Sequence, residues 1–132
     1  MYDEVIARVE GALKTLGLEP GDAKTEEGQY SISKDQDTDL LMDVWKDEDK
    51  IFFQIMSPVN KIARTDDAQF YKTLLEENHN MAEAAFVIIE DKIFIRETIE
   101  CTAFFSQERI LSLITRIAWY SEHYRQKWSS KD

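Results

Sequence analysis

Apolar residues recur at the spacing of an α-helix in three parts of the chain. These parts are residues 1–16, 65–78 and 107–128. Gly17 ends the first predicted helix, and Thr65 and Ser106 stand at the N-cap positions of the other two. The residues predicted to be buried on these helices are Val5, Val9, Ala12, Leu13, Leu16, Phe70, Tyr71, Leu74, Leu75, Ile110, Leu111, Ile114, Ile117, Ala118 and Ser121.

Five shorter apolar or alternating segments predict β-strands at residues 29–33, 40–45, 51–56, 84–89 and 92–99. The polar turns at residues 46–50 and 90–91 predict two hairpins. Segment 51–56 is apolar on nearly both faces, which predicts a central strand covered on two sides. The order α-β-β-β-α-β-β-α predicts an α+β fold, with a five-stranded antiparallel sheet and three helices, in a single domain covering residues 1–132.

The distribution of charge along the chain excludes some classes of binding partner. The net charge of the 132 residues is −10. Residues 19–49 contribute −8, from 11 acids and 3 lysines, whereas residues 101–132 contribute +2, from 3 acids and 5 bases. Such an acidic domain repels phosphate groups, so we predict no binding to nucleic acid or to anionic membranes.

The cysteine content and the length of the apolar runs predict the cellular compartment of the protein. Cys101 is the single cysteine, which excludes an internal disulfide and suits a reducing compartment. The acidic start of the chain lacks the basic flank and apolar block of a signal peptide. No apolar run approaches the ~20 residues of a membrane span. We therefore expect a cytoplasmic protein.

The residues that usually carry chemistry are sparse. The acids at 35, 37 and 39 imitate the start of a calcium loop, but Leu40 replaces its glycine and Lys46 its bidentate glutamate. His79 and His123 lack partners at zinc-ligand spacing. Cys101 is expected to be a buried structural thiol, although the sequence leaves a Cys–His pair in space open. We predict no metal, no cofactor and no enzyme activity.

Two surplus apolar surfaces are candidate interfaces. One side of the last helix carries Tyr120 and Tyr124 with Leu113 and Arg116, away from its buried stripe, unless the sheet and first helix enclose it. The second surface is the sheet face opposite the helices, unless helix 65–78 covers it. The predicted protein-binding or dimer surface is therefore Leu41, Trp45, Phe52, Met56, Leu113, Tyr120 and Tyr124.

A motif in the middle of the chain resembles a known family. Leu74-Leu75-Glu76-Glu77-Asn78 ends a helix and leads into the hairpin at residues 85–95 with its acidic turn. This pattern and the element order are similar to those of type III secretion chaperones and of the related YbjN-like bacterial proteins. The resemblance implies a homodimer that grips extended protein segments or regulates a partner without catalysis. Because the sequence indicates no secretion system, we favour the YbjN-like side.

The sequence thus predicts a non-catalytic protein-binding domain, chaperone-like or regulatory, that acts as a homodimer on an unidentified protein client. The alternative is a sensory or regulatory domain that binds a small ligand between sheet and helices, with Gln54, Tyr71 and Arg96 as lining residues. An undetected enzyme is a third hypothesis, and it requires titratable groups clustered in a cleft.

Overall fold

The computed structural model describes residues 1–34, 38–61 and 68–129. In that part of the chain the helices are α1 (Tyr2–Thr15), α2 (Pro20–Ala23), α3 (Ala68–Glu77), the 3-10 turn η1 (Asn78–Asn80) and α4 (Gln107–Ser129). The strands are β1 (Lys24–Glu26), β2 (Gln29–Ser33), β3 (Asp39–Asp47), β4 (Lys50–Lys61), β5 (Ala85–Ile89) and β6 (Lys92–Cys101). The α+β class and the antiparallel sheet are confirmed, but the sheet has six strands instead of five, and the short helix α2 adds to the three predicted helices.

The strands form one antiparallel sheet in the order β1-β2-β3-β4-β6-β5. Both predicted hairpins are present, and their turns hold Glu48 and Glu90 at a φ of 56°. The additional strand β1 was missed because its three residues are polar and exposed and show no alternation. A tight turn through Gly28 returns it onto β2. Gly28 has a φ of 77°, and a Cβ there would lie 2.5 Å from the carbonyl oxygen of Val44. The close approach excludes a Cβ, so this position requires glycine, which also adopts the positive φ without strain.

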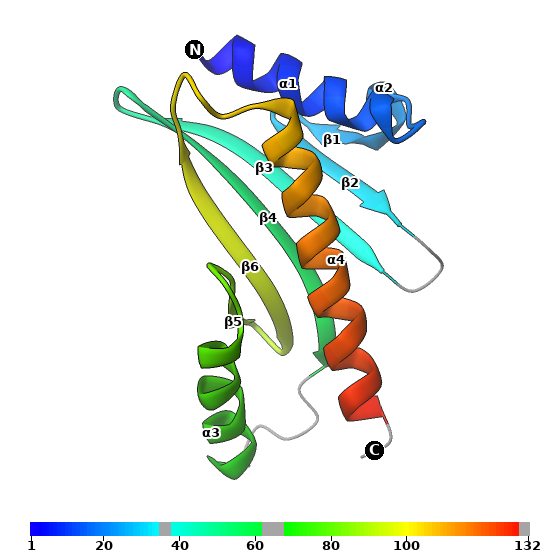
Figure 1. The fold of residues 1–132 in the computed structure, drawn as a ribbon, viewed down its shortest axis with the longest axis vertical. Helices are drawn as coiled ribbons and strands as arrows, with labels where there is room; N and C mark the ends of the chain where they lie inside the picture. The colour runs from blue at the N-terminus through cyan, green and yellow to red at the C-terminus, as the bar shows by residue number, and fades with distance from the viewer. Residues whose placement is uncertain (35–37, 62–67, 130–132) are drawn as a thin grey trace.

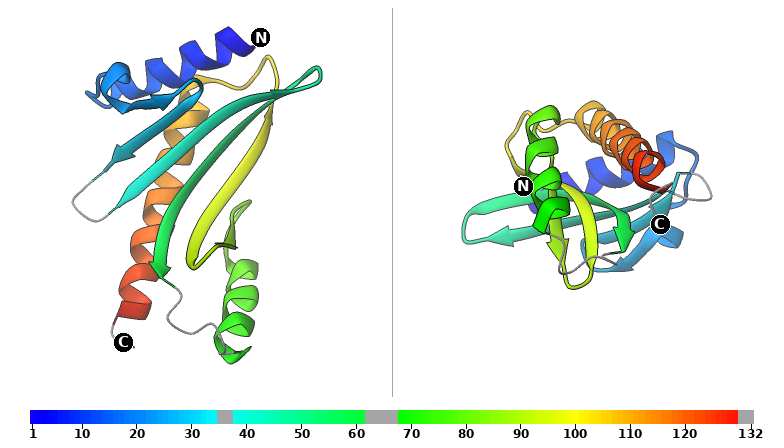
Figure 2. Two further views of the ribbon diagram at one scale, coloured as in Figure 1. Left: turned by 180° about the vertical axis from the view of Figure 1, so that it is seen from behind. Right: turned by 90° about the horizontal axis from the view of Figure 1, so that it is seen from below.

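The long helices lie on one side of the sheet (Figures 1 and 2). Helix α4 crosses β3, β4 and β6, and α1 packs against α4 and β3. The side-chain oxygen of Ser106 accepts a hydrogen bond from the backbone N–H of Arg109 at 3.1 Å, which confirms the predicted cap. The core between the layers includes Val5, Val9, Ala12, Leu13, Leu40, Met42, Val44, Phe53, Ile55, Ile93, Ile95, Ile110, Leu113, Ile114 and Ile117.

Three predictions of burial were wrong. Leu16, at the end of α1, is 46% exposed, and Leu75, on α3, is 72% exposed. Strand β4 is central, but it is not covered on both sides. Its residues alternate between a buried set facing the helices and a half-buried set on the opposite face. The sheet therefore has an outer face with no helix packed on its middle.

Two sequence predictions fall outside the described residues. They are the N-cap at Thr65 and the acids Asp35 and Asp37 of the calcium-loop comparison. Within the described part of the chain, no helix is long and apolar enough to cross a membrane. The same residues contain no group of three or more histidine, cysteine, aspartate or glutamate side chains placed to hold a metal ion.

Candidate protein-binding surface

The outer face of the sheet is built from alternate residues of β3, β4 and β6. Antiparallel register places directly paired residues on the same face, so each pair forms a rung across the sheet. Leu41 pairs with Met56, and Trp45 pairs with Phe52. All four side chains are half-buried. The structure thus brings together the four sheet residues that the sequence predicted, on the face opposite the helices.

An aromatic stack closes one end of this surface. The rings of Trp45 and Phe52 lie 5.6 Å apart between centroids, with 23° between their planes. Offset stacking of this kind favours flat, rigid contact area, and tryptophan and phenylalanine are enriched at the centres of protein interfaces. The pair therefore forms a rigid apolar platform next to the β3–β4 turn.

A polar rung separates the aromatic stack from the aliphatic pair. Asp43 pairs with Gln54, whose side-chain oxygen accepts a hydrogen bond from the Thr98 hydroxyl at 3.1 Å. A hollow of about 190 Å³ opens here. Its lining residues are Thr25, Gln29, Tyr30, Ser31, Leu41, Met42, Asp43, Gln54 and Met56. Burial raises the pKa of Asp43 above its ordinary value. A hydrogen bond from the backbone of Val44 acts in the opposite direction and is the smaller effect.

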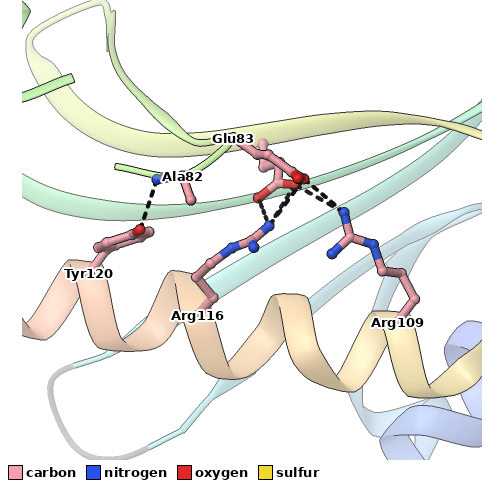
Figure 3. Close-up of polar contacts among 6 residues, drawn as sticks. Ala82, Glu83, Arg109, Arg116 and Tyr120 are labelled. Atoms are coloured by element: carbon pink, nitrogen blue, oxygen red, sulfur yellow. Dashed lines mark hydrogen bonds and ion pairs between the residues drawn. The ribbon is translucent and has the colours of Figure 1, made fainter. Parts of the chain in front are cut away.

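The predicted surface on α4 was partly wrong. Leu113 is fully buried, Tyr124 is 3% exposed and Tyr120 is half-buried. The chain following α3 encloses this side of the helix. The ring of Phe86 lies 4.8 Å from that of Tyr124, and the Tyr120 hydroxyl accepts a hydrogen bond from the backbone N–H of Ala82 at 2.9 Å (Figure 3). Sequence spacing could not show that residues 78–86 return to this helix.

The exposed aromatic side chain of α4 is instead Trp119, which is 58% exposed. Its ring stacks on that of His123 with 5.0 Å between centroids. These two residues lie one turn apart on the outer side of the helix. The pair is small compared with the sheet face, which carries four large apolar side chains.

A cluster of ion pairs fastens the segment before β5 to α4 (Figure 3). One nitrogen of Arg116 donates to both carboxylate oxygens of Glu97, at 2.6 and 2.8 Å. Arg109 donates to Glu83 at 2.8 Å. Burial raises the pKa of Glu97, and Arg116 opposes that shift, whereas the hydrogen bond from Arg109 lowers the pKa of the exposed Glu83. Each carboxylate already holds a guanidinium, so the cluster serves structure.

A second polar cluster holds the end of α3. Glu77 accepts hydrogen bonds from the Tyr124 hydroxyl at 2.8 Å and from Lys127 at 3.0 Å. The hydrogen bond from Lys127 is the largest cause that lowers the pKa of Glu77. Burial, followed by this hydrogen bond to Glu77, raises the pKa of Tyr124 to about 12. These contacts fix the end of α3 against α4.

An apolar groove lies between α3 and the edge strand β5. It has a volume of about 210 Å³ and is lined by Tyr71, Leu74, Leu75, Asn78, Phe86 and Ile88. Leu75 is 72% exposed and Ile88 is 49% exposed. Exposed leucine and isoleucine beside one hollow form an unfilled apolar surface. The sequence pattern did not predict this groove, because Leu75 belongs to the apolar stripe of its helix and was expected to be buried.

The geometry gives little support to the two alternatives, a small-ligand-binding domain and an enzyme. Gln54 and Arg96 lie on the outer face of the sheet, while Tyr71 lines the groove beside α3, so the three predicted ligand-lining residues do not meet. Cys101 is buried, as predicted, and burial raises its pKa to about 11. An activated nucleophile needs a lowered pKa, so this thiol is not poised for catalysis.

Comparison with known proteins places the fold. No protein-family model and no curated protein sequence matches the chain. Three solved structures match nearly all of it. A chain of the ExsC–ExsE complex has a TM-score of 0.74 at 13% identity, covering 96% of this chain and 94% of that one. The HopA1–SchA chaperone–effector complex gives 0.69 at 10% identity, with 92% and 93% covered.

The third match is the heterodimeric ExoU–SpcU complex from the type III secretion system of Pseudomonas aeruginosa. It gives a TM-score of 0.62 at 10% identity, with 89% of this chain and 94% of that one covered. The chain therefore has the secretion-chaperone fold, as the resemblance of its central motif predicted. At these identities the likeness is one of fold alone.

Proposed function

We propose that this protein is a non-catalytic, chaperone-like protein-binding domain that acts as a homodimer on a protein client. The observation that carries the proposal is the outer sheet face, where four large apolar side chains remain half-exposed in the middle of the sheet. The fold supports it, since one of the matching structures is a chaperone–effector complex. A buried free cysteine agrees with a reducing cytoplasm.

The client surface proposed here is the sheet-face set Leu41, Trp45, Phe52 and Met56. Half-exposed aromatic and methionine side chains on a rigid sheet provide adaptable contact area, and a bound segment would remove them from water. Of the α4 residues predicted from the sequence, Leu113 and Tyr124 are buried inside the chain, and we do not include them in this surface.

The homodimer interface proposed here is the groove between α3 and β5. Strand β5 ends the sheet, and an apolar edge of this kind is commonly covered by a partner. A two-fold axis would bring Leu75 and Ile88 of one copy against the same groove of the other. This arrangement covers the two exposed aliphatic side chains and leaves the outer sheet face open for a client.

The homodimer is tested by the solution mass, measured by light scattering over a range of protein concentrations. The wild-type protein is expected to be a dimer, and Ile88→Lys is expected to be a monomer that remains folded, because residue 88 is exposed. Trp119→Ala, which removes an exposed aromatic side chain on α4, is the matched control and should leave the dimer intact. A wild-type monomer at every concentration would refute the homodimer.

Client binding is tested with peptides selected from a random displayed library against the wild-type protein. Trp45→Ala and Phe52→Ala should abolish binding of the selected peptides, and Trp119→Ala should not. If the selected peptides bind all three variants equally, the outer sheet face is not the client surface.

A further inference from the structure

The outward positions of β3 alternate between acidic and apolar side chains. They are Asp39, Leu41, Asp43, Trp45 and Asp47. Every charged residue among them is an aspartate. Successive outward residues of a strand are about 7 Å apart, because each residue rises about 3.4 Å. The client surface is therefore a row of carboxylates and apolar groups with a regular spacing.

Asp43 lies at the centre of this row and lacks a cation. Among the described residues, no lysine or arginine forms an ion pair with it, whereas Lys50 on the neighbouring strand pairs with Glu100 at 4.0 Å. The hollow beside Asp43 holds about 190 Å³. Its walls combine the aliphatic side chains of Leu41 and Met56 with the amide of Gln54. Such walls suit a long side chain whose stem is apolar and whose end is cationic.

Resting on the proposed function of the outer sheet face, we propose that the client is an extended segment in which a lysine or arginine occupies the Asp43 hollow between two apolar side chains. In an extended segment, residues two apart project on one side at the same spacing as the rungs. An apolar residue would contact Leu41 and Met56, and a second would contact Trp45 and Phe52. A further basic residue would face Asp39, whereas Asp47 already has Lys50 as its partner in the register.

A second copy of this chain is a poor occupant of the same face. Copies related by a two-fold axis at β3 would oppose the three aspartates of one strand to those of the other, which costs free energy. The chain as a whole carries a net charge of −10, which adds long-range repulsion. The acidic row therefore selects a basic partner and directs dimerisation to another surface.

The experiment measures binding of three synthetic peptides by fluorescence anisotropy. The first alternates lysine with leucine or phenylalanine at the outward spacing, the second replaces each lysine with glutamate, and the third keeps the lysines but replaces the apolar residues with serine. Only the first is expected to bind. Asp43→Asn is expected to weaken it roughly five- to tenfold, as loss of a partly buried ion pair would. Glu122→Gln, on the exposed side of α4, removes one charge elsewhere and should change nothing.

The outcomes separate this inference from the proposed function. If Trp45→Ala abolishes peptide binding while Asp43→Asn and the lysine-to-glutamate exchange have no effect, the sheet face binds clients but the inference is overturned. If the serine peptide binds as well as the first, binding is a general attraction of charges, which also overturns it. If no peptide of any class binds, both proposals fail.

Discussion

The backbone N–H of Phe86, in β5, donates a hydrogen bond to the side-chain oxygen of Asn78, 2.6 Å away. Asn78 follows α3, so its side chain joins the end of the helix to the strand eight residues later. Strand β5 is the last strand of the sheet, and this N–H donates to a side chain instead of to β6. It therefore points away from β6. The asparagine of the central motif therefore also protects the edge strand.

This hydrogen bond is the basis of the first prediction. Asn78→Ala leaves a part-buried backbone donor without its partner and should lower the free energy of unfolding by about 1 kcal/mol. Urea unfolding followed by circular dichroism measures the change. Asn80→Ala is the control, since Asn80 is exposed and contacts Glu77 at 3.3 Å. Equal effects of the two substitutions would show that the Asn78 contact does not stabilise the fold.

The two neighbouring phenylalanines of β4 test whether the sheet has an open face. Phe53 is fully buried among the helices, whereas Phe52 lies half-buried on the outer face. Phe53→Ala should cost about 3–5 kcal/mol through the lost burial and the cavity it leaves. Phe52→Ala should lower the free energy of unfolding by about 1 kcal/mol or less, because it removes only the half-buried ring stacked on Trp45. Similar losses in thermal unfolding would mean that something covers the outer face.

The buried ion pair of Glu97 and Arg116 is the basis of the third prediction. Arg116→Ala leaves the buried carboxylate of Glu97 with only its longer ion pair to Arg109, at 3.7 Å, and the expected loss of stability is about 3 kcal/mol. The loss should shrink as the pH falls toward the ordinary glutamate value of 4.5, because burial raises the pKa of Glu97 and the folded variant takes up a proton first. Arg109→Ala should cost less, since Arg109 mainly contacts the exposed Glu83.

Tyr124 predicts how stability changes in alkali. Its pKa is raised from 10.0 to about 12 by burial and by its hydrogen bond to Glu77. Between these values the unfolded chain loses the phenolic proton while the folded chain keeps it, so ΔG of unfolding falls as the pH rises. The contribution is complete below pH 10 and lost above about 12.

The matching variant is Tyr124→Phe. It should be less stable than the wild type at neutral pH by about 1 kcal/mol, because it lacks the hydrogen bond. As the pH rises above 10, the difference in urea midpoint between the two proteins should narrow, since only the wild type loses the Tyr124 contribution. A constant difference across this pH range would contradict the raised pKa.

Cys101 gives a probe of the core that needs no substitution. Its side chain is 6% exposed, and burial raises its pKa to about 11. A thiol reagent such as a disulfide-exchange chromophore should therefore react slowly with the folded protein and rapidly in urea. Fast reaction in native buffer would show that the end of β6 opens readily and that the thiol is not part of the rigid core.

Local sequence patterns determined most of the elements of this protein. Apolar spacing predicted α1, α3 and α4, and short apolar or alternating segments predicted five of the six strands with both hairpins. The reason is that helix and strand periods are properties of neighbouring residues. Alternation within β3 also separated Leu41 and Trp45 from Leu40 and Met42, which placed two of the four sheet-face residues on the outer face.

The tertiary structure alone decided which apolar residues stay exposed. The sequence contains the same type of residue in Leu113 and Leu75, yet the first is fully buried and the second is 72% exposed. That outcome depends on where residues 78–86 cross α4 and on where the sheet ends, which are contacts between distant parts of the chain. The Glu97–Arg116 pair and the uncompensated Asp43 arise in the same way, because burial and charge pairing are properties of assembled layers and of no single segment.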